Sequence, residues 1–186
     1  MREQSASQAP RVLLTREQIA TRIEQLGAQI SRDFAGESVL LLAVLKGASI
    51  FLADLARSLS LDAQFEFVMA ASYGGARHSQ GTVSLLQSVA GPVEGRNVIL
   101  VEDILDTGRT LNYLLRTLQP RNPRQLKVAV LLDKPARRER AVHADYVGFR
   151  IPNHFVVGYG MDFDERYRNL PEICILPMAG PPDPAG

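Results

Sequence analysis

The chain lacks tryptophan altogether and has a single cysteine, Cys174, among its 186 residues. One cysteine cannot form a disulfide within the chain, so the fold does not depend on such a cross-link, and a cytoplasmic location is the simplest expectation. No apolar run approaches the roughly 18 residues of a membrane-spanning helix. The first ten residues, MREQSASQAP, also lack the apolar core of a signal peptide. We therefore expect no contact with a membrane.

An excess of charge of one sign is also missing. Lys and Arg number 21 against 20 Asp and Glu, a formal net charge of +1, which provides no general attraction to nucleic acid. Any anion binding must be local. The length and the 46% hydrophobic content fit one globular domain with a sizeable core. Polar residues 1–10 and the Pro/Gly-rich residues 179–186 are predicted to be disordered tails around a domain at 11–178.

The spacing of apolar residues predicts alternating helices and strands. Thr15 and Gln18 form a capping box before a helix that extends to about residue 32. Two strands at 38–45 and 97–103 are each followed by a helix, at 49–59 and 110–118, and a further buried strand is expected at 125–133. This order predicts an α/β fold with a mainly parallel central sheet flanked by helices. Ligands of such folds bind beyond the carboxyl ends of the strands.

The stretch VEDILDTGRT, residues 101–110, places acidic residues and a small-residue turn at one of these strand ends. Glu102 and Asp103 end the strand, where carboxylates can also be merely solvated or cap the next helix. The turn at 106–110 opens a helix, so its free N–H groups, its two hydroxyls and the helix dipole suit a phosphate. The GxxxxGK[ST] and GxGxxG patterns are absent from the chain. A phosphate cradle beside carboxylates indicates a sugar phosphate as ligand.

The same stretch resembles the signature with which type I phosphoribosyltransferases bind 5-phosphoribosyl-1-pyrophosphate (PRPP). The resemblance extends over about residues 12–177, and the segments at 44–47, 72–74, 131–135 and 146–170 match the purine branch of that family. It implies the type I phosphoribosyltransferase fold, with a small hood and a mobile loop over the site. The implied reaction is Mg²⁺-dependent transfer of phosphoribosyl from PRPP to N9 of hypoxanthine and/or guanine in purine salvage, by a homodimer or homotetramer.

The resemblance assigns the acidic residues to the sugar and to proton transfer. Glu102 and Asp103 would accept hydrogen bonds from the ribose hydroxyls. Asp106 would be the catalytic residue, exchanging a proton with purine N7, although from the residues alone it can instead cap the following helix. The implied binding residues for PRPP and its 5′-phosphate are Glu102, Asp103, Asp106, Thr107, Gly108, Arg109 and Thr110.

Further residues are candidates for binding pyrophosphate and Mg²⁺. Lys46 and Gly47 follow a strand, where backbone amides can face an anion, although a lysine in such a turn is also consistent with a solvated side chain. The resemblance implies a cis peptide between Leu45 and Lys46, and pyrophosphate binding by Leu45, Lys46, Gly47 and Arg168. Carboxylates suit a hard cation, and the implied Mg²⁺ ligands are Glu102, Asp103 and Asp162.

The base is assigned to residues near the end of the strand at 125–133. Lys134 would donate to O6 of the purine, and adenine, which has an amino group at that position, would be rejected. Phe155 would stack on the ring, although its alternating pattern alone also fits an ordinary core residue. The remaining implied purine-binding residues are Ile104, Val156 and Asp162.

Two questions stay open at the level of sequence. Arg137, Arg138 and Arg140 form a basic patch, which keeps an RNA-binding regulator with the same fold as an alternative. The preference among hypoxanthine, guanine and xanthine depends on backbone groups around C2 of the base.

The segment at 72–83 resembles the mobile loop, in which Ser72 and Tyr73 would close over the site, although on its own it also fits a surface hairpin.

Overall fold

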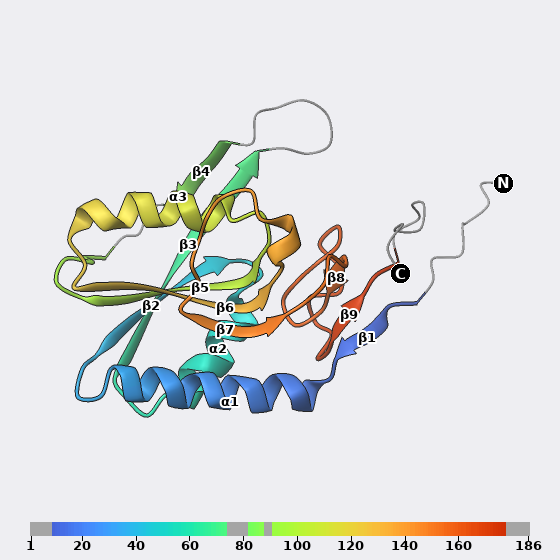
Figure 1. Cartoon of the computed structure of the whole chain (residues 1–186), viewed down its shortest axis with the longest axis horizontal. Coiled ribbons are helices and arrows are strands. Elements are labelled where there is room, and N and C mark those ends of the chain that lie inside the picture. Colours follow the sequence, from blue (N-terminus) through green and yellow to red (C-terminus); the bar gives the residue numbers. More distant parts are fainter. Residues whose placement is uncertain (1–8, 74–81, 88–90, 178–186) are drawn as a thin grey trace.

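The structure is a computed structural model that describes residues 9–73, 82–87 and 91–177. Its largest element is a six-stranded sheet with the order β4-β3-β2-β5-β6-β7 (Figure 1). The neighbouring strands β3, β2, β5, β6 and β7 pair in parallel, and β4 is antiparallel to β3. The strands are β2 (Val39–Leu45), β3 (Ala63–Tyr73), β4 (Thr82–Gln87), β5 (Asn97–Leu105), β6 (Gln125–Asp133) and β7 (Tyr146–Arg150). The predicted α/β class with a mainly parallel sheet is confirmed.

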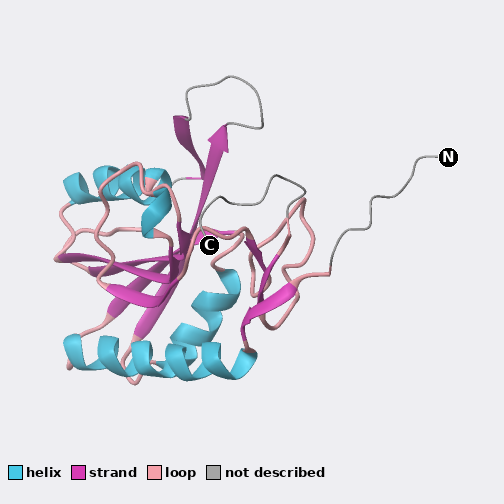
Figure 2. Cartoon of the chain, turned by 45° about the vertical axis from the view of Figure 1, so that its right-hand side comes forward, coloured by secondary structure: helices cyan, strands magenta, loops and turns pink. Residues whose placement is uncertain are grey.

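Helices cover both faces of this sheet (Figures 1 and 2). The helices α1 (Arg16–Asp33) and α2 (Ser49–Ser58) lie on one face, and α3 (Arg109–Leu118) lies on the other. The predicted capping box starts α1, because the Thr15 N–H donates to Gln18 Oε1 at 2.9 Å and the Gln18 N–H donates to Thr15 Oγ1 at 3.3 Å. Short 3-10 turns occupy Gln119–Arg121 and Pro135–Arg137.

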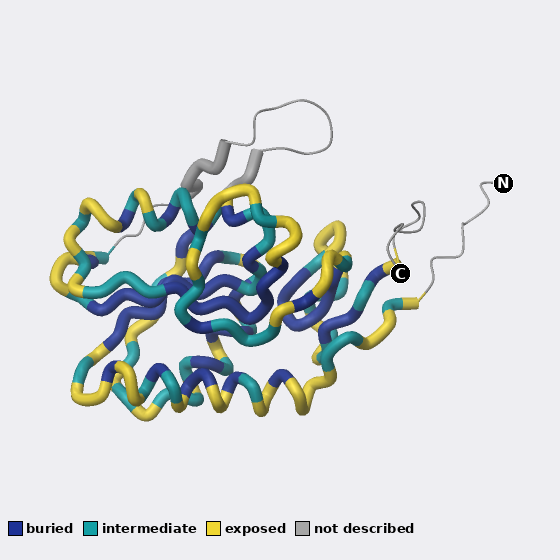
Figure 3. The backbone as a smooth tube through the Cα atoms, viewed as in Figure 1, coloured by how far each residue is buried: buried dark blue, intermediate teal, exposed yellow. Residues whose placement is uncertain are grey.

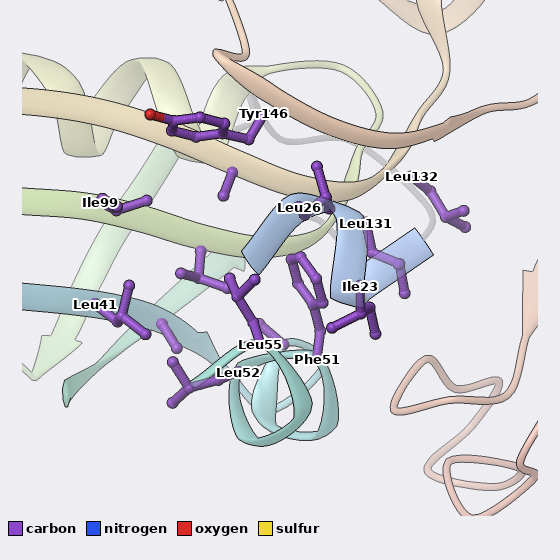
Figure 4. Packing of buried hydrophobic residues seen from close by; sticks show 14 of the residues in the cluster. Ile23, Leu26, Leu41, Phe51, Leu52, Leu55, Ile99, Leu131, Leu132 and Tyr146 are labelled. Atoms are coloured by element: carbon purple, nitrogen blue, oxygen red, sulfur yellow. The ribbon is translucent and has the colours of Figure 1, made fainter. Parts of the chain in front are cut away.

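The central strands are buried on both sides (Figure 3). On the α1 and α2 side, Leu26 and Phe51 pack with Leu41, Ile99 and Leu131 of the strands (Figure 4). A second apolar cluster lies beneath α3. Burial on both faces explains why these strands are continuous apolar runs and do not alternate. Among the helices in the described residues, none has the length and hydropathy needed to cross a membrane.

A small second sheet lies beside the larger one (Figure 1). Its order is β1-β9-β8, and the strands are β1 (Arg11–Leu14), β9 (Ile173–Ile175) and β8 (Val156–Val157). Both pairings are antiparallel. This sheet occupies the place of the predicted hood. Cys174 is buried in it, and burial raises the pKa of its thiol, which is unfavourable for a nucleophile.

The predicted mobile loop begins at the end of β3. The backbones of Ser72 and Tyr73 pair with Val83 and Thr82 of β4. Residues 74–81 lie outside the described residues, as do residues 1–8 and 178–186, so the mobile loop and the two disordered tails stay predictions.

Candidate functional site

The carboxyl ends of β2, β5 and β6 meet at one edge of the sheet. Parallel pairing aligns Ala43 of β2 with Val101 of β5, and Leu105 with Asp133 of β6. Beyond these ends the N–H of Lys134 donates to the Leu105 carbonyl at 3.0 Å. The predicted phosphate turn and the predicted base-reading lysine therefore lie next to each other, although about 25 residues separate them in the sequence.

The turn at 106–110 leads directly from β5 into α3. Gly108 is the N-cap of α3, with φ +79°, and Thr107 Oγ1 accepts from the Arg109 N–H of the first turn at 3.4 Å. Among the described residues the Asp106 carboxylate accepts a hydrogen bond only from Arg137, so the interpretation of Asp106 as the helix cap is wrong. A β-carbon at position 108 would lie 2.7 Å from the Arg140 carbonyl oxygen, so the turn needs glycine for both its conformation and its space. The turn lines a cavity of about 60 Å³ together with Glu102 and Ile104. A helix N-terminus of this kind suits a phosphate.

Glu102 and Asp103 lie near the carboxyl end of β5 and do not end it as predicted, because β5 continues to Leu105. Their environment disfavours their negative charge. Glu102 is 8% exposed, and burial raises its pKa well above the ordinary value, with the charge of Asp103 raising it further. Burial likewise raises the pKa of Asp103 to about 6, although the Ile104 N–H donates to its Oδ1 at 3.0 Å. Two carboxyls with raised pKa values at a strand end are typical of a functional site. A bound cation or ligand hydroxyls would favour their ionised form.

The turn after β2 approaches this pair closely. The Leu45–Lys46 peptide is cis, as the resemblance implied. A β-carbon on Gly47 would lie 1.9 Å from Asp103 Oδ2, and one on Gly160 would lie 2.2 Å from the Gly47 carbonyl oxygen. Three segments distant in sequence thus converge here because two of the residues at the contact are glycines.

The predicted pyrophosphate ligands Lys46 and Arg168 also lie close together. Arg168 donates from Nη1 to the Gly160 carbonyl at 2.8 Å, and its Nη2 pairs with Asp162 Oδ1 at 2.8 Å and with Glu165 Oε2 at 3.3 Å. The same oxygen of Glu165 accepts from Lys46 Nζ at 3.0 Å. In the part of the chain that the structure describes, Arg168 Nε is buried without a hydrogen-bond partner. Sequence reasoning did not single out Glu165, which links both cations.

Lys134 is the buried cation of the site. It is 6% exposed, and no hydrogen bond or ion pair of its ammonium occurs within the described residues. Burial lowers its pKa, and the nearby charge of Asp106 opposes this effect. The Asp106 carboxylate accepts from Arg137 Nε at 3.3 Å. The predicted base-reading donor and the predicted proton-transfer group are therefore near enough for their charges to interact.

Phe155 lies directly before β8. Its side chain is 39% exposed, so the interpretation as an ordinary core residue is wrong. Its ring meets Phe163 edge to face, with the centroids 5.6 Å apart, next to Asp162 in the sequence. The neighbouring Val156 is buried in β8, where it pairs with Ile175.

The predicted Mg²⁺ ligands come from two segments. The negative charge of Asp162 contributes to the raised pKa of Asp103, so these carboxylates interact. Among the described residues, however, no group of three or more His, Cys, Asp or Glu side chains is placed to hold a metal ion, so Glu102, Asp103 and Asp162 do not form a preassembled site. Mg²⁺ commonly uses one or two carboxylates together with waters and substrate oxygens. The donor chemistry fits that mode of binding.

Two of the arginines after Lys134 form ion pairs with acidic residues at the strand ends. Arg137 pairs with Asp106, and Arg138 forms an ion pair with Asp133 and donates to the Leu105 carbonyl at 3.4 Å. The side chain of Arg138 is only 19% exposed. Arg138 thus helps to hold the ends of two strands in place and is mostly buried, whereas the side chain of Arg137 is 49% exposed despite its ion pair.

A larger cavity of about 620 Å³ lies elsewhere, between α1, α2 and residues 169–171. Of the predicted site residues that the structure describes, none lines it. The convergence of carboxylates, cations and a helix N-terminus at the strand ends therefore remains the candidate site.

Comparison with known proteins agrees with this geometry. Residues 12–164 match the family described as the phosphoribosyl transferase domain. The chain belongs to this family. A hypoxanthine-guanine phosphoribosyltransferase from Mycobacterium avium is 52% identical, over 89% of this chain and 84% of the relative. Another from Streptococcus thermophilus (strain CNRZ 1066) is 44% identical, over 89% of this chain and 92% of the relative.

Solved structures confirm the phosphoribosyltransferase fold. A hypoxanthine-guanine phosphoribosyltransferase from Bacillus anthracis superimposes with a TM-score of 0.84 and 45% identity, over 89% of this chain and 97% of the other. A hypoxanthine phosphoribosyltransferase from Staphylococcus aureus gives a TM-score of 0.86 and 39% identity, over 92% of each chain. The predicted type I fold is thereby confirmed.

Proposed function

We propose that this chain transfers 5-phosphoribosyl from PRPP to N9 of hypoxanthine and/or guanine, giving IMP or GMP and pyrophosphate in purine salvage. The observation that carries the proposal is the position of VEDILDTGRT, which spans the end of β5, the following turn and the start of α3, beside Lys134. Relatives that cover most of the chain are named for this activity.

The β5 end and the following turn supply the sugar-phosphate site. Glu102 and Asp103 accept hydrogen bonds from the ribose hydroxyls, which offset the cost of their buried charge. The turn at 106–110 binds the 5′-phosphate through N–H groups at the start of α3 and through hydroxyls. In the reaction the bond from C1′ to the pyrophosphate oxygen breaks and a bond from C1′ to N9 forms. The base loses the proton on N7, and the Asp106 carboxylate accepts it.

Pyrophosphate binds on the side of Lys46 and Gly47, with Arg168 as the second cation. We propose that Mg²⁺ is held there by the carboxylates of Glu102, Asp103 and Asp162, not all of them directly, together with substrate oxygens. When bound, the ion neutralises part of the charge of the leaving pyrophosphate. The support from this chain is the mutual electrostatic influence of Asp103, Asp162 and Arg168.

The base lies between Lys134 and the aromatic segment before β8. The free ammonium of Lys134 donates to O6, a bond that the amino group of adenine cannot accept. Phe155 offers an exposed ring for stacking. Ile104, Val156 and Asp162 complete the proposed pocket, and Ser72 and Tyr73 would close over it to keep water from C1′.

The alternative of an RNA-binding regulator gains no support from the arginine patch, because Arg137 and Arg138 are paired with Asp106 and Asp133. Assembly to a homodimer or homotetramer and a cytoplasmic location stay predictions from the sequence.

The direct test is product formation by the purified chain with PRPP and Mg²⁺, with hypoxanthine, guanine, xanthine and uracil offered separately. We expect a nucleoside monophosphate and an equal amount of pyrophosphate from hypoxanthine, guanine or both. Product from uracil alone, or from none of the bases, would overturn the proposal. A salt-dependent RNA-binding measurement in parallel tests the alternative.

A further inference from the structure

We propose that the carboxylate of Glu165 occupies the pyrophosphate position in the unliganded protein and competes with pyrophosphate for Lys46 and Arg168. This inference rests on the proposed function, because it identifies which group the leaving pyrophosphate must displace. Glu165 then sets the affinity of the site for PRPP and for the pyrophosphate product.

The geometry places a single carboxylate oxygen where an anion is expected. Oε2 of Glu165 lies 3.0 Å from Lys46 Nζ and 3.3 Å from Arg168 Nη2. One oxygen that bridges two cations from different segments has the contacts expected of a pyrophosphate oxygen held by the same pair.

The backbone around Glu165 aims this side chain at the two cations. The Glu165 N–H donates to Asp162 Oδ2 at 2.9 Å, and Phe163 and Arg166 form a β-bridge that closes the turn. Asp164 and Glu165 have φ values of +51° and +60°. Such left-handed conformations are uncommon for residues other than glycine and cluster at functional sites, where surrounding contacts hold them.

The contact is also placed so that a ligand can replace it. The side chain of Glu165 is 65% exposed and that of Lys46 is 58% exposed. Ion pairs between exposed side chains are weak because water and salt screen them. Glu165 can therefore occupy Lys46 and Arg168 when no ligand is bound. A multiply charged pyrophosphate can then displace its carboxylate.

The test is calorimetric titration of the full chain with inorganic pyrophosphate in the presence of Mg²⁺, for the wild type and for Glu165→Gln. If Glu165 competes, Glu165→Gln binds pyrophosphate about 3- to 10-fold more tightly, the range expected from the loss of two exposed ion pairs. Binding of GMP, which has no pyrophosphate group, stays within about two-fold. An unchanged pyrophosphate affinity would overturn the inference.

Two further variants separate occupancy from a general effect of charge. Glu94→Gln removes one exposed carboxylate from the turn before β5 and should leave pyrophosphate affinity unchanged. Glu165→Asp keeps the charge, but its side chain is one methylene shorter, so it should reproduce most of the gain seen with Glu165→Gln. The contrary result is that Glu165→Asp does not differ from the wild type while Glu165→Gln binds pyrophosphate more tightly. That result would show that the negative charge at position 165 acts from a distance, and it would exclude competition.

The outcome is distinguishable from a failure of the proposed function. A wild-type chain that binds neither PRPP nor pyrophosphate would overturn the proposed function and this inference together. A wild-type chain that binds both, with the same affinities in Glu165→Gln, would overturn the inference alone.

Discussion

Gly47 and Asp103 are in such close proximity that a β-carbon on Gly47 would lie 1.9 Å from Asp103 Oδ2. Asp103 lies in β5, and Gly47 lies in the turn that follows the neighbouring parallel strand β2. The absence of a side chain at position 47 is what lets the proposed pyrophosphate turn approach the proposed sugar-binding carboxylates. The approach of this turn to Asp103 therefore depends on glycine at position 47.

Replacement of Gly47 by alanine should displace this turn or the Asp103 carboxylate. We expect kcat/KM for PRPP to fall about 10- to 100-fold, since misplacement by about 1 Å has effects of that order. Steady-state kinetics with PRPP varied would measure the loss. Gly91→Ala is a suitable control, because its β-carbon would lie 3.6 Å from Glu66 Oε1, an ordinary contact. Equal activity of Gly47→Ala and the wild type would show that the close approach is not required.

Asp103→Asn should make the unliganded protein more stable at neutral pH. Burial raises the pKa of Asp103 to about 6, above its value in the unfolded chain of about 3.9. The folded state therefore binds the proton more tightly, and the stability that this carboxyl contributes below about pH 4 is lost as the pH rises through about 6. Asparagine stays neutral throughout. The free energy of unfolding of Asp103→Asn, relative to wild type, should thus increase by about 2 kcal/mol between pH 4 and pH 7.5.

Urea unfolding without Mg²⁺ and PRPP would measure this difference. The control is Asp62→Asn, at an exposed position before β3. Parallel pH profiles for Asp103→Asn and the wild type would contradict the assignment of a raised pKa to this carboxyl.

Asp106→Asn should lower kcat by about 10²- to 10⁴-fold, because an amide cannot accept the N7 proton. PRPP binding should stay within a few-fold, since the amide retains the size of the side chain and Asp106 does not cap α3. Single-turnover kinetics together with a PRPP binding isotherm separate the two effects. A variant with more than half of the wild-type kcat would remove Asp106 from the mechanism.

Removal of divalent metal should stop purine turnover, and addition of Mg²⁺ should restore it. The described residues do not form a preassembled site, so binding of the ion should require the oxygens of PRPP. Mg²⁺ titrations followed by calorimetry should therefore show much weaker binding without PRPP than with it. Full activity in excess chelator would contradict the proposed role of Mg²⁺.

The elements with the clearest local signals were predictable from the sequence. The strand at 125–133 and the capping box before α1 are present as predicted, because a continuous apolar run and a reciprocal cap depend on neighbouring residues alone. The small sheet of β1, β8 and β9 was not predicted strand by strand. Its strands have two to four residues each and depend on pairing between the two ends of the domain.

The site was predictable where a motif covered it and not where tertiary contacts made it. The turn at 106–110 lies at the start of α3 as expected. Glu165 is an exposed acid in an aperiodic segment, so nothing local marks its contact with Lys46, which is 119 residues away. The pairing of Arg138 with Asp133 was likewise missed, so Arg138 was counted with the basic patch although its side chain is only 19% exposed.

The central claim is that this site reads a 6-oxopurine through Lys134. The most direct measurement is the ratio of kcat/KM for hypoxanthine to that for adenine, in the wild type and in Lys134→Met, with Lys127→Met in the preceding strand β6 as the control. Methionine keeps most of the side-chain volume but cannot donate to O6, and it also lacks the donor that opposes the amino group of adenine. We predict that the ratio falls at least about ten-fold in Lys134→Met while the KM for PRPP stays within a few-fold. An unchanged ratio, or a loss confined to PRPP, would contradict the assignment of Lys134 to the base.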